Sequence, residues 1–466
     1  LEQGMEPERA NAITTYLGLW ISRLTDRCNG LARWDNSRET IVSLTSMKRF
    51  AMMWDFPEVN IFGGASGDAW GNLEYITSFV RQEGQFCNPA KVLRGSATEL
   101  PYENSIFDAV ITDPPYYDNE SYSELSDVCY VWLRPTIGFL YPEHFAGQLT
   151  PKKKECVAAA YRQGGKLKAK TYYEDCLFES LREAHRVTKP GGILIVVYAH
   201  KTTLGWATLV DALRRAGYEV AEAWPLATET KARVAHQGDA ALASSVFFVA
   251  RRRESTEIGS YEEQVRPDLE RIVRERVEAL WKMGIAGADL VMAAVGAGLR
   301  AFSRFSRVEY ANGEEVPAEK FLAEVEGVVL ETLLEKIFGV TGSGVAAVDG
   351  PSRFYVLWRY AYRAAEMDAG EAIVFTYGQN VELDGQNGLS SGSRALIEKK
   401  KGKYWLRDFT ERGDDEKLGM PKAVLADGSQ RADGATRADG MGTQAPLIDI
   451  LHRILWLMEN EPRNLN

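Results

Sequence analysis

Residues 107–116 read FDAVITDPPY, and this stretch decides the fold class of the chain. Its first part, Phe107–Thr112, is a short apolar run of the kind that forms buried strands in parallel sheets. A second such run, Gly192–Tyr198 (GILIVVY), comes later, and Tyr173–Val187 between them has the apolar spacing of a helix face. Strands that alternate with helices of this length predict an α/β fold with a parallel sheet.

The same patterns extend to both sides of this core. Strands are expected at Tyr218–Trp224 and Ser245–Ala250, after which helices dominate. The expected helices are Ala12–Leu24, Ala69–Val80, Trp206–Ala216, Tyr261–Met283, Gly287–Phe305, Glu319–Phe338, Phe354–Met367 and Pro446–Asn460. Three six-residue units in Leu425–Gly442 (LADGSQ, RADGAT and RADGMG) predict a flexible, turn-rich loop. We therefore expect four segments: a mixed helical segment (1–90), the α/β domain (91–253), a helical domain (254–345) and a C-terminal region (346–466).

The composition restricts the functions that the chain can have. Its 466 residues include 55 Lys and Arg against 65 Asp and Glu, so the net charge is −10 and any phosphate binding requires a local basic patch. The five cysteines form no C-x-x-C pair, which argues against a zinc ribbon or a disulfide framework and favours a reducing, cytoplasmic setting. Leu1–Ala10 is polar and does not resemble a signal peptide. The most apolar stretch, Ile285–Leu299, is shorter than the roughly 20 residues of a membrane span, so we expect a buried helix and no membrane partner.

The candidate catalytic residues are Asp113, Pro114, Pro115 and Tyr116, in the loop after the first strand. Ligand loops of α/β sheets lie at this end of the strands. Each proline fixes φ and removes an N–H donor, so the loop is stiff and its carbonyls remain available as acceptors. A carboxylate, a carbonyl and an aromatic ring together suit the exocyclic amino group and the face of a nucleobase. The alternative is a proline-rich turn without a chemical role.

The surroundings of this loop resemble those of class I S-adenosylmethionine-dependent methyltransferases that act on amino groups, and the DPPY form is similar to that of N6-adenine enzymes. More narrowly, several patches together resemble the prokaryotic adenine-specific DNA methylases that contain a zinc-ribbon domain. The similarity covers most of residues 10–360 and returns at Pro446–Leu457. The patches are Met53–Asn60, Asp113–Asn119, Leu125–Asp127, Tyr130–Leu133, Ala199–Thr203, Ala240–Ser245 and Gly287–Leu290.

The resemblance implies a Rossmann-like methyltransferase sheet, possibly incomplete, and a site-specific DNA-methyltransferase that modifies adenine N6, in restriction–modification or phage defence. It also implies a cofactor, S-adenosylmethionine, near Gly95, Ser96 and Ala97. At Ser96 the family tends to have an acidic residue that accepts a hydrogen bond from the cofactor's adenine. Two other functions remain open: methylation of RNA amino groups, and a non-catalytic half of a split methyltransferase that binds DNA or a partner.

The chain departs from the family in one respect that affects cofactor binding. Family members have an upstream D-P-F-x-G-G-G loop and zinc-ribbon cysteines, so this chain resembles their C-terminal part. The nearest internal substitute for that loop is residues 62–68, with Gly63, Gly64 and Gly67. Either Glu58–Phe62 supplies the strand beside Phe107–Thr112, or a second polypeptide supplies the strand, the cofactor loop and target recognition. We favour the second polypeptide, because the family carries its cofactor loop upstream.

A basic segment, Pro151–Tyr173, lies between the DPPY loop and the next helix. It contains seven Lys and Arg residues and a single acid, Glu155, so this segment is positively charged although the chain as a whole is acidic. This predicts contacts with DNA phosphates, and the alternative is a solvated helix face. His200 either lines the site or is a core histidine, and no set of metal ligands is expected. The candidate DNA-contacting residues are Lys152, Lys153, Lys154, Lys166, Lys168 and Lys170.

Overall fold

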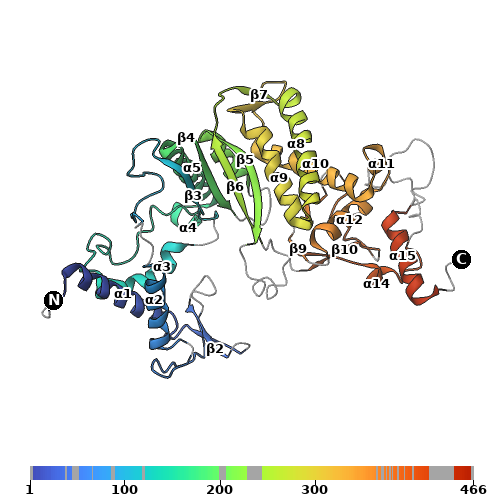
Figure 1. Cartoon of the computed structure of the whole chain (residues 1–466). Coiled ribbons are helices and arrows are strands. Elements are labelled where there is room, and N and C mark those ends of the chain that lie inside the picture. The colour runs from blue at the N-terminus through green and yellow to red at the C-terminus, as the bar shows by residue number, and fades with distance from the viewer. Residues whose placement is uncertain are drawn as a thin grey trace. The chain divides into compact units, whose positions relative to one another are not determined.

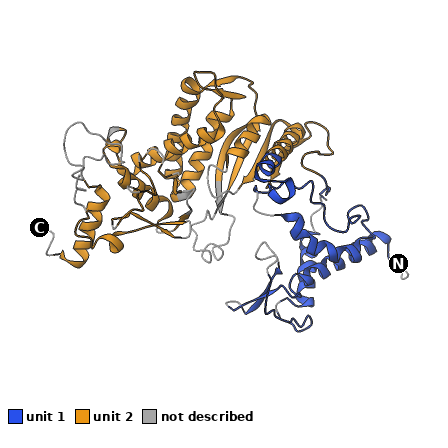
Figure 2. Ribbon diagram, turned by 180° about the vertical axis from the view of Figure 1, so that it is seen from behind, with its two compact units in different colours: residues 1–95, 115–173 blue, residues 96–114, 174–466 orange. Residues whose placement is uncertain are grey.

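The computed structural model (Figure 1) describes most of the chain. The described residues are 4–36, 39–44, 52–65, 67–84, 90–117, 121–198, 206–227, 244–363, 366–368, 372–373, 375–376, 379, 381–385, 388–392, 394–400, 403–418 and 445–462. The predicted loop Leu425–Gly442 and the candidate His200 lie outside them. The chain forms two compact units (Figure 2). Unit 1 comprises Leu1–Gly95 and Pro115–Tyr173, and unit 2 comprises Ser96–Pro114 and Glu174–Asn466. The expected α/β segment, 91–253, therefore contributes to both units.

Unit 1 is built on three helices. They are α1 (Pro7–Thr25), α2 (Ala69–Glu83) and α3 (Tyr122–Ile137). α1 packs on α3 at Gly18, where a β-carbon would lie 2.5 Å from Ile137 Cγ2, so only glycine allows this approach. α1 is tied to α2 by the Trp20 indole N–H, which donates to the Ala69 carbonyl at 2.8 Å. The smaller elements of the unit are β1 (Arg33–Asp35), β2 (Thr40–Val42), α4 (Ala160–Gln163) and the first two turns of α5 (Lys166–Val187).

Unit 2 contains a four-stranded mixed sheet. Its strands are β3 (Phe107–Thr112), β4 (Thr188–Tyr198), β5 (Tyr218–Ala227) and β6 (Ser244–Arg252), in the order β3-β4-β6-β5. β3 and β4 are parallel, as expected, but β6 runs antiparallel to both β4 and β5. The expectation of a parallel sheet is therefore confirmed for β3 and β4 and wrong for β6, and the sheet is mixed. The reason is that Ala227 pairs with Ser244, so β6 starts at the edge where β5 ends and returns alongside it.

The helix α5 and the strand β4 are continuous in sequence. The apolar run predicted β4 from Gly192, but the strand already begins at Thr188, directly after the helix. The register with β3 jumps from Phe107 opposite Thr188 to Ala109 opposite Ile193. Residues Lys189–Gly192, which lie between the predicted helix and the predicted strand, thus form a bulged strand start, which fits their proline and glycines.

Helices follow the sheet, as the apolar periodicity predicted. A π-helical turn, η3 (Tyr261–Val265), leads into α8 (Arg266–Lys282), and α6 (Ala207–Arg215) lies between β4 and β5 in the chain. α9 approaches β5 so closely that a β-carbon on Gly296 would lie 2.1 Å from Ala223 Cβ. The remaining larger helices are α9 (Gly287–Ser303), α10 (Ala318–Phe338), α12 (Gly350–Tyr362) and α15 (Leu447–Asn460). The small elements are β7 (Ile258–Ser260), β8 (Arg307–Glu309), α11 (Ser343–Ala346), β9 (Met367–Asp368), β10 (Ile397–Lys400), β11 (Lys403–Leu406) and α14 (Phe409–Arg412).

The apolar run around Ile285–Leu299 is the helix α9, and its residues from Leu290 to Leu299 are buried. This confirms the expectation of a buried helix. No helix in the described part of the chain has both the length and the apolar character needed to cross a membrane.

Candidate functional site

The DPPY motif follows β3 directly. Asp113 is exposed and, with Pro114, ends the first stretch of unit 2, while Pro115 begins the second stretch of unit 1. The Asp113 carboxylate and the Pro114 carbonyl therefore lie at the carboxyl end of a strand, where the sequence placed them. None of the described residues donates a hydrogen bond to the Pro114 carbonyl.

The second half of the motif is anchored within unit 1 by Tyr173. This tyrosine is fully buried, and its hydroxyl donates to the Pro115 carbonyl at 2.8 Å. Its ring also meets the ring of Tyr117 edge-on, with centroids 5.4 Å apart. The Tyr117 carbonyl in turn accepts a hydrogen bond from the Ala158 amide at 2.9 Å. Pro115 and Tyr117, the neighbours of Tyr116, are thus both held by the segment that follows α3.

Tyr117 has an unusual backbone conformation. Its φ is +47°, in the left-handed region that aromatic residues rarely adopt. Such a conformation costs roughly 1–3 kcal/mol and persists only where surrounding contacts enforce it. The Ala158 amide and the Tyr173 ring are those contacts. Strain of this kind is common in ligand-binding loops, although by itself it identifies no ligand.

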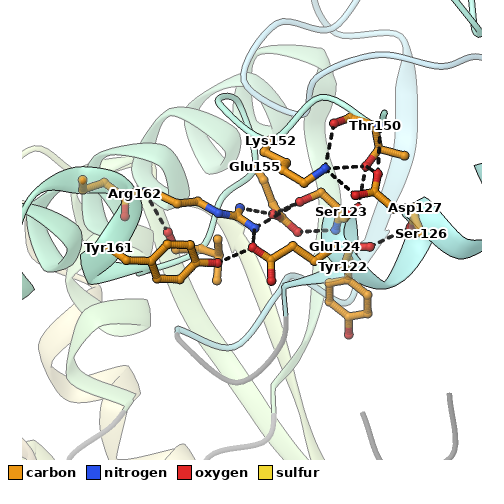
Figure 3. A network of polar contacts seen from close by, with 12 residues as sticks. Tyr122, Ser123, Glu124, Ser126, Asp127, Thr150, Lys152, Glu155, Tyr161 and Arg162 are labelled. Atoms are coloured by element: carbon orange, nitrogen blue, oxygen red, sulfur yellow. Dashed lines mark hydrogen bonds and ion pairs between the residues drawn. The ribbon is translucent and has the colours of Figure 1, made fainter. Parts of the chain in front are cut away.

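The start of α3 is fixed by a polar network (Figure 3). The Ser123 amide and hydroxyl donate to the two oxygens of Glu155 at 2.8 and 2.5 Å. Arg162 forms ion pairs with Glu155 at 2.5 Å and with Glu124 at 2.7 Å. The Tyr161 hydroxyl also donates to Glu124. The network therefore joins α3 to the chain around α4 through charge-assisted hydrogen bonds, which are stronger than neutral ones.

A second part of the same network is centred on Asp127 (Figure 3). Lys152 Nζ lies 2.7 Å from Asp127 Oδ2, and the Thr150 amide and hydroxyl donate to Asp127 Oδ1 at 2.9 and 2.6 Å. The Thr150 hydroxyl also lies 2.5 Å from the Ser123 carbonyl. These contacts tie residues 150–152 to the first two turns of α3.

The carboxylates of the network are held in their charged form. Burial alone would raise the pKa of Glu155, but the hydrogen bonds from Ser123 and Arg162 outweigh it and lower the pKa below its ordinary value. The same balance, with Lys152 and Thr150 as donors, lowers the pKa of Asp127. Arg162 and Lys152 therefore serve as fixed counter-charges inside the protein.

We call residues 150–173 the clasp, because this segment holds the chain on both sides of residues 118–120. Tyr173 and Ala158 hold Pro115 and Tyr117 before those residues, and the polar network holds the start of α3 after them. The predicted basic segment is almost the same stretch of chain. It is therefore attached to the motif loop and is not an independent surface feature.

The six candidate lysines fall into two groups. Lys152 is partly buried in its ion pair with Asp127, whereas Lys153, Lys154, Lys166, Lys168 and Lys170 are exposed. Lys166, Lys168 and Lys170 lie at the start of α5, where no acid occupies the first turn. Positive charge at a helix N-terminus opposes the helix dipole, so these lysines do not serve the stability of the helix. Phosphate binding remains a prediction for the exposed group.

The glycine-rich loop forms a turn before α2 and does not follow a strand. Glu58–Phe62 forms no strand, which removes the alternative in which this segment pairs beside β3. The Gly63 amide donates to the Asn60 carbonyl, and Gly64 and Gly67 have φ values of +72° and +93°. A β-carbon on Gly67 would lie 3.2 Å from Arg27 Cδ. The glycines thus shape a turn against Arg27.

The second group of cofactor candidates is divided between the units. Gly95 ends the first stretch of unit 1, and Ser96 and Ala97 begin unit 2. The Ser96 hydroxyl lies 2.7 Å from the Thr98 hydroxyl and also accepts from the Thr98 amide at 3.3 Å. Ser96 is therefore engaged in its own turn, while Gly95 faces open space.

β3 is an end strand of the sheet formed by the described residues. Its partner β4 lies on one side, and Ile111 keeps 69% of its surface exposed. Parallel strands are normally covered on both faces, so an exposed apolar β3 is unusual. The chain before β3 is firmly held: Arg186 donates to the carbonyls of Leu100 and Tyr102, at 3.0 and 2.7 Å.

Sequence reasoning missed the residues that hold the loop. Tyr117 and Asp127 appear only inside patches of the family resemblance, Ser123 lies in none of them, and Glu155 is only the single acid of a basic segment. Tyr173 stands out only as the first apolar residue of a predicted helix face and as an aromatic residue beside the lysines. No local signal marks these residues, because each acts through a partner distant in sequence. Among the described residues, no group of His, Cys, Asp or Glu could hold a metal ion.

No protein-family model matches the chain, and comparisons with curated proteins and with solved structures also find no match.

Proposed function

We propose that this protein is the substrate-binding part of an S-adenosylmethionine-dependent methyltransferase that acts on the N6 amino group of adenine in DNA. The observation that carries the proposal is the DPPY loop at the end of β3. It offers the Asp113 carboxylate and the Pro114 carbonyl as adjacent acceptors, and its next carbonyl, that of Pro115, is already engaged by Tyr173.

Two acceptors are what an adenine amino group requires. The N6 lone pair is delocalised into the ring, so the nitrogen is a poor nucleophile. Asp113 and the Pro114 carbonyl each accept one N–H bond, which draws the nitrogen towards a tetrahedral geometry and localises its lone pair. The charged acceptor gives the stronger of the two bonds and opposes the positive charge that develops on nitrogen. Asp113 need not remove a proton before attack.

The adenine has to leave the duplex, which costs a few kcal/mol. In the proposed complex the Tyr116 ring stacks on the base, which is worth roughly 1–3 kcal/mol. Exposed lysines of the clasp contact the phosphates on either side. This contribution is sequence-independent, so it sets affinity and salt dependence but not the recognition sequence.

The described residues of this chain do not by themselves fit the cofactor. The glycine turn is not preceded by a strand, the Ser96 hydroxyl is engaged with Thr98, and β3 has no described neighbour on its open side. In the methyltransferase fold the strand before the cofactor loop lies beside the strand that ends in the motif. We therefore propose that a second polypeptide adds a parallel strand to β3 and brings the cofactor loop.

The first experiment compares binding of single-stranded oligo-dA and oligo-dT by the full chain, which needs no cofactor. We expect a preference for oligo-dA that Asp113→Ala reduces by about 10–100-fold, because a charged hydrogen bond is worth roughly 1.5–3 kcal/mol. Asp113→Asn keeps one acceptor and should retain more of the preference. Equal affinity of the wild-type chain for the two oligonucleotides would contradict the proposal.

A matched pair of variants tests the stacking residue. Tyr116→Phe should retain capture of the base, and Tyr116→Ala should weaken it by about tenfold or more. If the two variants are equally impaired, the hydroxyl matters and the stacking role is wrong.

A second measurement separates the remaining functions. Equilibrium binding of S-adenosylmethionine to the isolated chain should be absent if a second polypeptide carries the cofactor loop. Tight binding, together with methylation of DNA by the chain alone, would show that the chain is a complete enzyme. Methylation of tRNA in preference to DNA would show that the substrate is RNA.

A further inference from the structure

We propose that Tyr173 is a positioning residue that decides which carbonyl of the motif faces the substrate and where the Tyr116 ring lies. This inference rests on the function proposed above. The motif alone does not settle which carbonyl is presented, since neither Pro114 nor Pro115 has an N–H and either carbonyl is a possible acceptor.

The buried hydroxyl of Tyr173 selects between the two carbonyls. The side chain is fully buried, and a buried hydroxyl without a partner is costly, so its bond to the Pro115 carbonyl is maintained. Because the Pro115 carbonyl accepts this hydrogen bond, it is not presented to the substrate. The Pro114 carbonyl, next to Asp113, remains.

The anchor also orients the Pro114 carbonyl. That carbonyl lies in the peptide plane that precedes the Pro115 ring, and the ring fixes φ of Pro115 near −65°. When the Pro115 carbonyl is held, a single backbone bond, ψ of Pro115, separates the held group from the presented one. A hydrogen bond on one carbonyl thus restricts the direction of the other.

Tyr173 also contacts Tyr117, the residue that follows Tyr116. Its ring contacts the ring of Tyr117, whose φ of +47° is enforced together with the Ala158 amide. Tyr116 therefore lies between two residues that one side chain holds. Because Tyr173 belongs to the long helix α5, its own position is set by a rigid element.

The adjacent tyrosine provides a matched control. The Tyr172 hydroxyl donates to the Lys153 carbonyl at 3.0 Å, so this hydrogen bond joins two residues of the clasp, whereas that of Tyr173 holds a residue of the motif. Tyr173→Phe and Tyr172→Phe remove the same atom from neighbouring positions of one helix. Both keep the ring, so we expect both variants to fold with the wild-type thermal midpoint to within a few degrees.

The first readout is amide hydrogen exchange of the free protein. In Tyr173→Phe the Ala158 amide, which donates to the Tyr117 carbonyl, should exchange about fivefold faster, which corresponds to loss of one ordinary hydrogen bond. In Tyr172→Phe this amide should exchange at the wild-type rate. Unchanged exchange in Tyr173→Phe would overturn the positioning role, whatever the activity of the protein.

The second readout is the oligonucleotide comparison. Tyr173→Phe should lower the affinity for oligo-dA several-fold and leave the affinity for oligo-dT unchanged, because only the base contacts depend on the loop. A merely structural role would lower both affinities. Equal loss of both would therefore overturn the proposal.

The two proposals fail in different ways. If the wild-type chain shows no adenine preference, the function proposed above is wrong, and hydrogen exchange still decides whether Tyr173 holds the loop. If the wild-type chain prefers adenine and Tyr173→Phe keeps the full preference, the function stands and the positioning role is wrong.

Discussion

Two regions of the molecule are stabilised by different kinds of contact. One is the group of helices α8, α9 and α10 in unit 2, and the other is the clasp in unit 1. The helices pack through fully buried apolar side chains, such as Leu269 and Val273, and Phe302 stacks on Phe321 with centroids 4.5 Å apart. The clasp is held by Tyr173 on Pro115 and by ion pairs such as that of Arg162 with Glu155.

The difference follows from what each region has to do. Apolar burial is strong and non-directional, so it stabilises helices without fixing single atoms. Hydrogen bonds weaken steeply with distance and angle, so they specify positions more than they add stability. Under the function proposed above, the motif loop presents two acceptors to one amino group, and this requires directional contacts.

Buried carboxyl groups show the same contrast. In the clasp, hydrogen bonds from Ser123 and Arg162 outweigh burial and lower the pKa of Glu155. In α10, burial raises the pKa of Glu326 to about 8, and its Oε1 has no hydrogen-bond partner among the described residues. One carboxyl is charged because it is paired, and the other is neutral because it is not.

The largest effect should come from the apolar region. Phe302→Ala should lower the free energy of unfolding by about 3–5 kcal/mol, because it removes a fully buried ring and leaves a cavity. Urea denaturation measures this loss. The matched control is Phe139→Ala, which removes an exposed ring and should change stability by less than about 0.5 kcal/mol. Similar losses in both variants would contradict the contrast between the regions.

The next effect is a pH dependence that Glu326 introduces. Its folded pKa lies above its unfolded value, so its favourable contribution is complete below the unfolded pKa and is lost as the pH rises towards 8. Glu326→Gln should therefore stabilise the protein by about 4 kcal/mol at pH 8 and have little effect at pH 4. Urea denaturation at the two pH values measures the difference. An equal effect at both would mean that Glu326 is paired and charged.

A smaller loss is expected in the clasp. Arg162→Met leaves Glu155 without its cation and should destabilise this region by about 1–3 kcal/mol, seen as faster amide exchange in residues 150–162. Adding Glu155→Gln should restore part of the loss, since the unpaired charge is gone.

The control for this change is an exposed arginine. Arg271 pairs with Asp268 and Glu275 on the surface of α8, so Arg271→Met should cost less than about 0.5 kcal/mol. If Arg162→Met is equally mild, the clasp is not held by its ion pairs.

The smallest change in stability, with a clear change in binding, should come from the exposed lysines. Replacing Lys153, Lys154, Lys166 and Lys168 by Gln should alter the free energy of unfolding by less than about 0.5 kcal/mol. It should lower DNA affinity and reduce the salt slope by about 0.9 for each phosphate that is no longer neutralised. Salt titrations of binding measure the slope, and Lys320→Gln with Lys417→Gln is the control. An unchanged salt slope would mean that these lysines form a solvated surface and do not contact phosphates.

The sequence by itself determined the strand that leads into the motif and the long helices that follow the sheet. β3 has the predicted bounds, and the helical faces of α9 and α10 lie within two residues of their predicted limits. Apolar runs and 3.6-residue spacing are local signals, and burial of those same residues makes them reliable. The motif at the end of β3 was found in the same way, since it is continuous in sequence.

Only the tertiary structure decided how the motif is held. Tyr173 and Pro115 are 58 positions apart, and Lys152 and Asp127 are 25 apart, so no local pattern pairs them. Lys152 resembles its neighbours in sequence, yet it neutralises a carboxylate while they are exposed. The direction of β6 depends on its pairing with β5, which apolar composition does not encode. The physical reason is the same throughout: residue type sets what a side chain can bond, and the folded backbone sets which partner comes within reach.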